Sequence, residues 1–235
     1  MFTLRSAISA MTLAASMIFT AGVASAGPAV IGYSNGNFSN MSCGWLGGCS
    51  TNDTEEGNDS QMEWGSLFGT GSTLTAIKRD WEFDSPKEGA VLAELQWSNA
   101  STSAWTTPPV FSALYNLSIG FTSPANAEDS EQFNLTIFNV LNNLGDVLLG
   151  LQFADLANLS FDLGDVSVSN LRYQLASGPG SFEHNIWYNP ENRISTLYIM
   201  ADFTEQSVAE VPEPTSLALL GLGLFGVGML RRRRS

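Results

Sequence analysis

The chain has one histidine, His184 in the segment FEHNIWYN, which is a candidate general base near neutral pH. No serine lies in a G-x-S-x-G motif, and one histidine is too few for the usual catalytic zinc site. Glycoside hydrolysis would instead use two carboxylates across a cleft, and the acids on or beside expected strands are Glu82, Asp84, Glu94 and Glu183. No motif around them indicates a glycosidase. We therefore expect a non-enzymatic protein with a structural or turn histidine, and keep a polysaccharide hydrolase as the third hypothesis.

Carboxylates are dense in residues 52–60, NDTEEGNDS, where Asp53, Glu55, Glu56 and Asp59 alternate with amide and hydroxyl side chains. Hard oxygen ligands on a loop are what calcium binds, but the spacing matches neither an EF-hand nor a nonapeptide calcium repeat. A structural calcium site and a plain solvated acidic loop both remain open, and we expect no other cofactor.

Five of the six tryptophans fall into two groups, and the sixth is Trp187 in the segment FEHNIWYN. Trp45 and Trp105 lie in polar, loop-like segments, where an exposed ring can stack on a sugar, so they are the candidate glycan-binding residues. Trp64, Trp81 and Trp97 lie in strand-like patterns and are expected in the core.

The two cysteines, Cys43 and Cys49, lie in the segment CGWLGGC. Five intervening residues, three of them glycine, allow the Cα separation that a disulfide requires. A redox site would more usually be C-x-x-C, and a zinc site needs further ligands. In an exported chain we expect a disulfide that closes a small loop.

The residues between the two ends of the chain read as strands and turns. Phe133, Leu135 and Ile137 alternate with polar residues, as do Leu197 and Ile199, and turn dipeptides such as Ser85-Pro86 separate the runs. The expected strands are 27–34, 61–68, 74–83, 90–97, 112–121, 132–140, 147–153, 159–161, 166–175, 182–188 and 194–203. Residues 35–60 are expected to form a loop, and 125–132 or 151–159 could hold a helical turn. This pattern predicts an all-β protein, an antiparallel jelly-roll-like β-sandwich over residues 27–205.

The charge is one-sided. The whole chain has a net charge of −13, and leaving out the two ends, with five arginines and one glutamate between them, brings the remainder near −17. Such acidity argues against binding nucleic acid or anionic lipid through a basic patch.

The N-terminal segment predicts export. Arg5 is followed by the apolar run 7–19 and by Ala24-Ser25-Ala26, which together are typical of a cleavable signal peptide over residues 1–26. We expect the Sec machinery and signal peptidase to act on it, so that the mature chain begins at Gly27.

The C-terminal segment has three parts after a linker at 206–211. These are Val211-Pro212-Glu213-Pro214, a charge-free apolar run at 215–230, and a stop-transfer cluster of Arg231, Arg232, Arg233 and Arg234. Sixteen apolar residues are just short of the usual membrane span, and arginine snorkelling makes a marginal membrane helix plausible. An ordinary membrane anchor would also fit this pattern.

The segment VPEPTS, the Leu/Gly-rich run and the arginine cluster together resemble the PEP-CTERM sorting signal over residues 212–235. The resemblance implies cleavage by an exosortase, a membrane transpeptidase of Gram-negative bacteria that make exopolysaccharide. The body is less closely similar to THxN-type PEP-CTERM proteins, through Met62–Gly65 and the segment from Phe182 to Pro190, although Glu183 stands where those proteins have threonine.

These features lead to one hypothesis and one alternative. The first is a non-enzymatic surface or extracellular-matrix protein, anchored transiently in the membrane and associating with exopolysaccharide or biofilm matrix. The alternative is a carbohydrate-binding module, for which dependence on calcium is left open.

Overall fold

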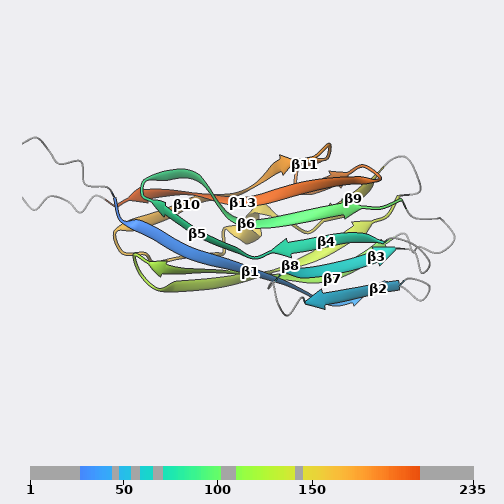
Figure 1. Ribbon diagram of the computed structural model, residues 1–235, viewed down its shortest axis with the longest axis horizontal. Coiled ribbons are helices and arrows are strands. Elements are labelled where there is room, and N and C mark those ends of the chain that lie inside the picture. Colours follow the sequence, from blue (N-terminus) through green and yellow to red (C-terminus); the bar gives the residue numbers. More distant parts are fainter. Residues whose placement is uncertain are drawn as a thin grey trace, which may run out of the picture.

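The computed structural model describes residues 27–43, 48–53, 59–65, 71–101, 110–140 and 145–206. Nearly all of them lie in strands of two antiparallel sheets (Figure 1). The elements are β1 (Ala29–Ser42), β2 (Gly48–Asp53), β3 (Ser60–Gly65), β4 (Ser72–Ile77), β5 (Arg79–Asp84), β6 (Lys87–Asn99), β7 (Val110–Ser123), β8 (Ala127–Phe138), β9 (Asp146–Leu149), α1 (Phe153–Leu156), β10 (Val166–Ser177), β11 (Ser181–Glu183), β12 (Ile186–Asn189) and β13 (Arg193–Glu205).

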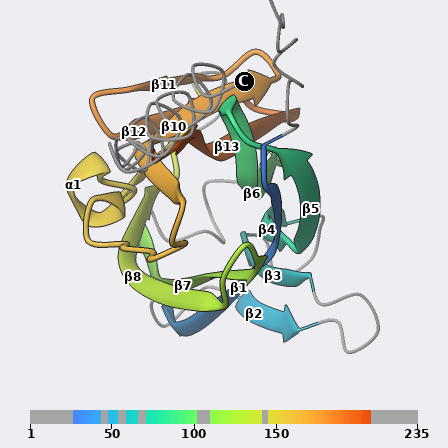
Figure 2. The same cartoon turned by 90° about the vertical axis from the view of Figure 1, so that its left-hand side faces the viewer.

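The seven-stranded sheet has the order β11-β12-β9-β8-β7-β1-β5, and the six-stranded sheet has the order β10-β13-β6-β4-β3-β2. Figure 2, seen along the strands, shows the two sheets curving around a common interior. The expected all-β sandwich is confirmed. Within the described ranges, no helix is long and apolar enough to cross a membrane.

The core forms from the inward-facing residues of both sheets. Phe133, Leu135 and Ile137 on β8 are at most 1% exposed, and the alternating residues of β13 are equally buried, as their period-2 pattern predicted. Trp64 and Trp97 are fully buried and Trp81 is 9% exposed, which confirms the expectation for these three. The ring of Trp97 lies 5.4 Å from that of Trp187 and 6.2 Å from that of Trp64, measured between centroids.

The prediction of a loop over 35–60 is wrong for residues 35–42 and 48–53, because β1 continues to Ser42 and β2 adds a further edge strand, while residues 44–47 and 54–58 lie outside the described residues. The asparagines of β1, Asn35, Asn37 and Asn40, are exposed on its outer face, where side-chain amides pair across strands. Asn116 Nδ2 donates to Asn37 Oδ1 at 2.8 Å, and Gln132 Nε2 donates to Asn116 Oδ1 at 2.6 Å. This amide ladder stabilises a central strand whose composition alone indicates a loop.

The single strand expected over 74–83 is two strands, because the chain passes from the six-stranded to the seven-stranded sheet at Lys78. The amide of Lys78 donates to Asp59 Oδ1 at 2.8 Å, so a carboxylate holds the crossing point. Apolar alternation continues through the crossing, since Ala76 and Trp81 bury into the same core from opposite sheets. The pattern therefore carries no sign of the break.

Three smaller differences are local. Residues 182–188 form the β11–β12 hairpin, in which His184 and Asn185 have φ of 51° and 65°, as both central residues of a type I′ turn must have positive φ. Residues 159–161 are not a strand, and 127–132 belong to β8. The expected helical turn within 151–159 is present as α1.

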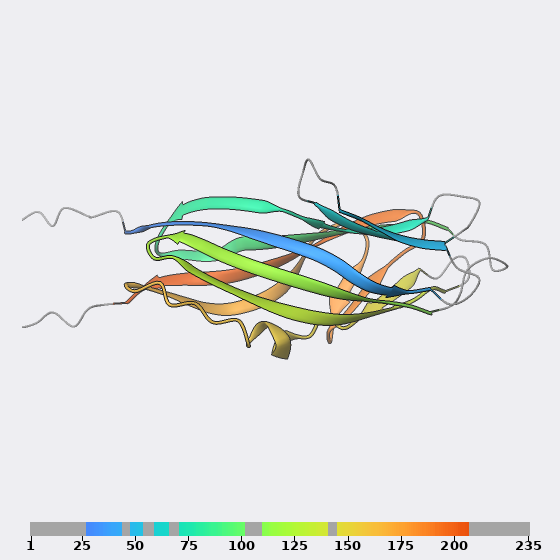
Figure 3. The same cartoon turned by 90° about the horizontal axis from the view of Figure 1, so that it is seen from below.

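Both ends of the described domain meet at one end of the sandwich, which we call the proximal end (Figure 3). A Cβ on Gly27 would collide with the carbonyl oxygen of Ser85 and with Glu205 Oε1, so the first residue and the end of β13 touch. The amide of Gln206 donates to the carbonyl of Asp165 at 2.7 Å and holds the exit of the chain there.

Candidate functional site

Most of the residues singled out from the sequence lie outside the described residues. This is true of Trp45, Trp105, Glu55 and Glu56, and also of the signal peptide 1–26, the motif 211–214, the apolar run 215–230 and the arginines at 231–234. Of the four carboxylates expected to bind calcium, Asp53 ends β2 opposite Ser60, and Asp59 accepts the amide of Lys78. In the described part of the chain, no group of three metal-binding side chains of the His, Cys, Asp and Glu types occurs. Calcium at 52–60 stays a prediction.

The described residues that flank Trp45 and Trp105 in the sequence lie at the end of the sandwich opposite the proximal end, which we call the distal end. Ser42, which precedes residues 44–47, pairs with Ser112, which follows residues 102–109, across β1 and β7. The Cα atoms of Cys43 and Cys49 are 6.1 Å apart, a separation that a disulfide spans. Segments far apart in sequence are thus brought to one end.

The carboxylates considered for hydrolysis are separated. Glu82 lies on β5 and Glu183 on β11, which are opposite edges of the seven-stranded sheet. Glu94 forms an ion pair with Arg79. His184 is exposed in the hairpin turn. The structure brings these side chains into no common cleft, although Glu82 and Asp84 are neighbours on one exposed face.

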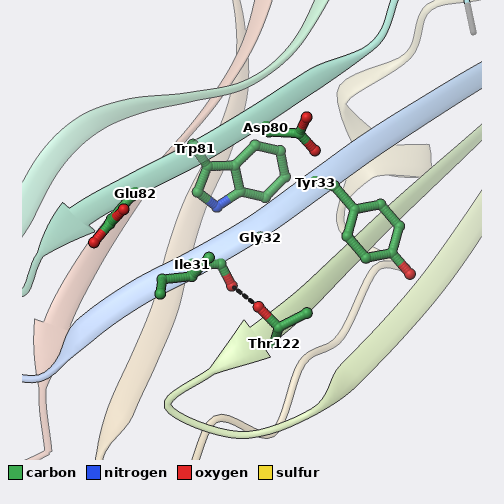
Figure 4. Close-up of a pocket in the computed structure, with 7 residues that line it drawn as sticks. All are labelled: Ile31, Gly32, Tyr33, Asp80, Trp81, Glu82 and Thr122. Carbon is green, nitrogen blue, oxygen red and sulfur yellow. Dashed lines mark hydrogen bonds between the residues drawn. The ribbon is translucent and has the colours of Figure 1, made fainter.

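An open hollow of about 420 Å³ lies over β5, β1 and β7 near the proximal end. Figure 4 shows its lining side chains, and the hydroxyl of Thr122 donates to the carbonyl of Ile31 at 3.4 Å. Asp80, opposite Tyr33 in the strand register, and Glu82, opposite Ile31, are both exposed at its rim. This arrangement can accept hydrogen bonds from a hydroxyl-bearing ligand, and it lies away from the distal end.

A buried polar cluster at the distal end was missed by sequence reasoning. Asp146 opens β9 and pairs directly with Asn189, the last residue of β12, and both are 0% exposed. Burial raises the pKa of Asp146 to about 7; a hydrogen bond from the amide of Val140 opposes this rise and the charge of Glu191 adds to it. Burial also raises the pKa of Glu191. In the sequence, Gly145-Asp146 and Asn189-Pro190-Glu191 indicate only turns.

The comparisons with known proteins concern the C-terminus. A family model for the PEP-CTERM protein-sorting motif matches residues 210–234. The chain thus carries the sorting signal of exosortase substrates, which marks it for export, transient anchoring in the membrane, and then the cell surface or exterior. Comparison with curated proteins finds no significant match.

Proposed function

We propose that the protein is a non-enzymatic surface protein that presents the distal end of its β-sandwich to exopolysaccharide. The observation that carries this proposal is the position of the two ends of the domain. Because β13 ends at the proximal end and the sorting motif follows at 210–234, the attached chain leaves from there. The distal end, where the described residues that flank Trp45 and Trp105 in the sequence lie, therefore faces away from the attachment point.

The length of the sandwich supports this display. β1 runs for 14 residues, and at about 3.3 Å per residue it spans roughly 45 Å. The distal end therefore stands well clear of the membrane, which suits contact with an extended polymer outside the cell.

The chemistry of the distal end favours a neutral, hydroxyl-rich partner. Aromatic rings on loops stack on sugars, whereas the net charge near −17 between the two ends of the chain disfavours anionic partners and nucleic acid. A carbohydrate-binding module that recognises one defined glycan is the alternative, and the same loops would serve it.

Mass spectrometry of protein from the exporting host is expected to show a chain that begins at Gly27 and ends near Pro214. Signal peptidase removes residues 1–26, and an exosortase cuts at the motif 211–214 and removes 215–235. The same spectrum tests the disulfide, since pairing of Cys43 with Cys49 lowers the intact mass by two hydrogens relative to the reduced protein. An intact tail ending in Arg234-Ser235 on the surface protein would contradict processing.

Replacement of Trp45 and Trp105 together by alanine is expected to reduce retention on the host's purified exopolysaccharide at least tenfold, because each ring stacked on a sugar contributes about 1 kcal/mol or more. Affinity electrophoresis or biolayer interferometry measures the change. Tyr33→Ala, in the proximal hollow, is the matched aromatic control and should bind as the unchanged protein does. Equal binding by the double variant would contradict a distal site. Breakdown of the polymer, abolished by changing one carboxylate, would contradict a non-enzymatic role.

A further inference from the structure

Three polar residues lie at the distal end, where the start of β9 pairs with the end of β12. Asp146 and Asn189 face each other in the register of the two strands, with no exposed surface on either. Glu191 follows two residues after Asn189, and its charge acts on Asp146. The backbones are packed closely, since a Cβ on Gly145 would lie 2.6 Å from the carbonyl oxygen of Asn189.

The orientation of the Asn189 amide is determined by its donors. Its Nδ2 donates to the carbonyl of Trp97 at 2.9 Å and to the carbonyl of Arg193 at 3.2 Å. Both donor positions are thus used by backbone acceptors, which leaves the other end of the amide as oxygen. This Oδ1 is buried and has no hydrogen-bond partner.

Unpaired buried oxygens also occur on the carboxylate of Glu191, two residues after Asn189. Both Oε1 and Oε2 of Glu191 are buried without a hydrogen-bond partner. Buried polar atoms are almost always paired, and leaving a charged one unpaired costs several kcal/mol. Three unpaired oxygens beside a buried aspartate therefore indicate a missing positive partner.

No basic side chain of the described residues supplies that partner. The two ion pairs found there are Arg79 with Glu94 and Arg172 with Asp202. Two adjacent carboxylates and an amide oxygen are hard ligands, with a total charge that a divalent cation neutralises. Calcium fits best, because it accepts irregular sets of six to eight oxygens, including carbonyls and water, whereas magnesium demands a near-ideal octahedron.

We propose that Asp146, Asn189 Oδ1 and Glu191 bind a calcium ion at the distal end of the sandwich. The ion would join the start of β9 to the end of β12 and the residues that follow it, and thereby stiffen the distal end of the sandwich. Residues 52–60 are a separate candidate calcium site next to β2 and β3, so variants of Glu191 and variants of Glu55 and Glu56 distinguish the two sites. Calcium binding at either site is measured without polysaccharide.

The test uses protein purified from the exporting host and stripped with EGTA. Calcium chloride is expected to raise its melting temperature, and isothermal titration to show saturable binding. Glu191→Gln keeps the shape of the side chain, and it should lower the calcium affinity at least tenfold and remove most of the melting shift. Glu82→Gln, an exposed acid on β5, is the matched control and should leave both unchanged.

A second readout avoids dependence on stability. Terbium replaces calcium in oxygen sites and is sensitised by nearby indole rings, and Asn189 directly contacts the backbone of Trp97. We expect terbium emission under tryptophan excitation, displaced by calcium and lost in Glu191→Gln. Absence of saturable binding, unchanged affinity in Glu191→Gln, loss of binding only after changing Glu55 and Glu56, or equal affinity for magnesium would each overturn the proposal.

Discussion

Replacement of Trp97 by alanine is expected to lower the free energy of unfolding by about 3–5 kcal/mol, which is the usual cost of removing a large buried aromatic side chain. Trp97 is fully buried and packs against the rings of Trp64 and Trp187. Its removal leaves a cavity where the two sheets meet, and the neighbouring rings lose their contacts. The Nε1 of Trp97 has no hydrogen-bond partner, so the alanine variant no longer buries an unpaired donor. This gain offsets only a small part of the lost stability.

Urea unfolding followed by tryptophan fluorescence and circular dichroism measures this change, with the midpoint falling at constant slope. Ile194→Ala is the control, because Ile194 is 54% exposed on the neighbouring strand and its truncation should change stability by less than about 0.5 kcal/mol. A loss below about 1 kcal/mol for Trp97→Ala would contradict the packing described for this cluster.

The stability of the calcium-free protein is expected to fall as pH rises from about 4 to about 7 because of Asp146. Burial raises the pKa of this carboxyl from 3.8 to about 7, so the folded state holds a proton that the unfolded state releases. The contribution is therefore complete below pH 4 and lost as pH rises through the folded pKa. The difference corresponds to roughly 4 kcal/mol at most.

Asp146→Asn isolates this contribution, because an amide keeps the acceptor for the amide of Val140 and does not titrate. In EGTA, we expect the variant to lose the decline between pH 4 and 7 and to exceed the unchanged protein in melting temperature at pH 8. Parallel pH profiles for the two proteins would show that Asp146 is not the titrating group. Asp84→Asn, on the exposed edge of β5, is the control for added amide and lost surface charge.

Regular alternation made most of the sandwich predictable. The runs around Phe133 and Leu197 bury one face against the core, and strands with that pattern were correctly located. The central strand β1 was cut short, because its outward Asn and Ser residues are stabilised by partners on β7 that are about 80 positions away. The change of sheet at Lys78 could not be predicted, because the strands before and after it, β4 and β5, both bury apolar residues in the same core and the alternation continues unbroken.

The sorting motif could be predicted from the sequence, whereas the buried polar cluster at the distal end could not. A sorting motif is local, so residues 211–214 and the arginines beyond them could be recognised without a fold. The cluster of Asp146, Asn189 and Glu191 is assembled by strand pairing between residues 43 positions apart, and each member alone has the composition of a turn. Only burial, and the orientation of the Asn189 amide, distinguish it from a solvated turn.

The place of β13 in its sheet has a consequence for the order in which the chain folds during export. β13 lies between β10 and β6, with antiparallel pairing on both sides, so until Arg193–Glu205 has crossed the membrane the six-stranded sheet is two unconnected pieces. Because the sorting signal begins within a few residues of β13, the last strand reaches the outside only as the tail engages the membrane. Completion of the fold is thus timed to the end of translocation. The pairing with β10 joins residues that are near in sequence, whereas the pairing with β6 joins residues 94 to 116 positions apart, such as Arg193 with Asn99, and such distant pairings form slowly.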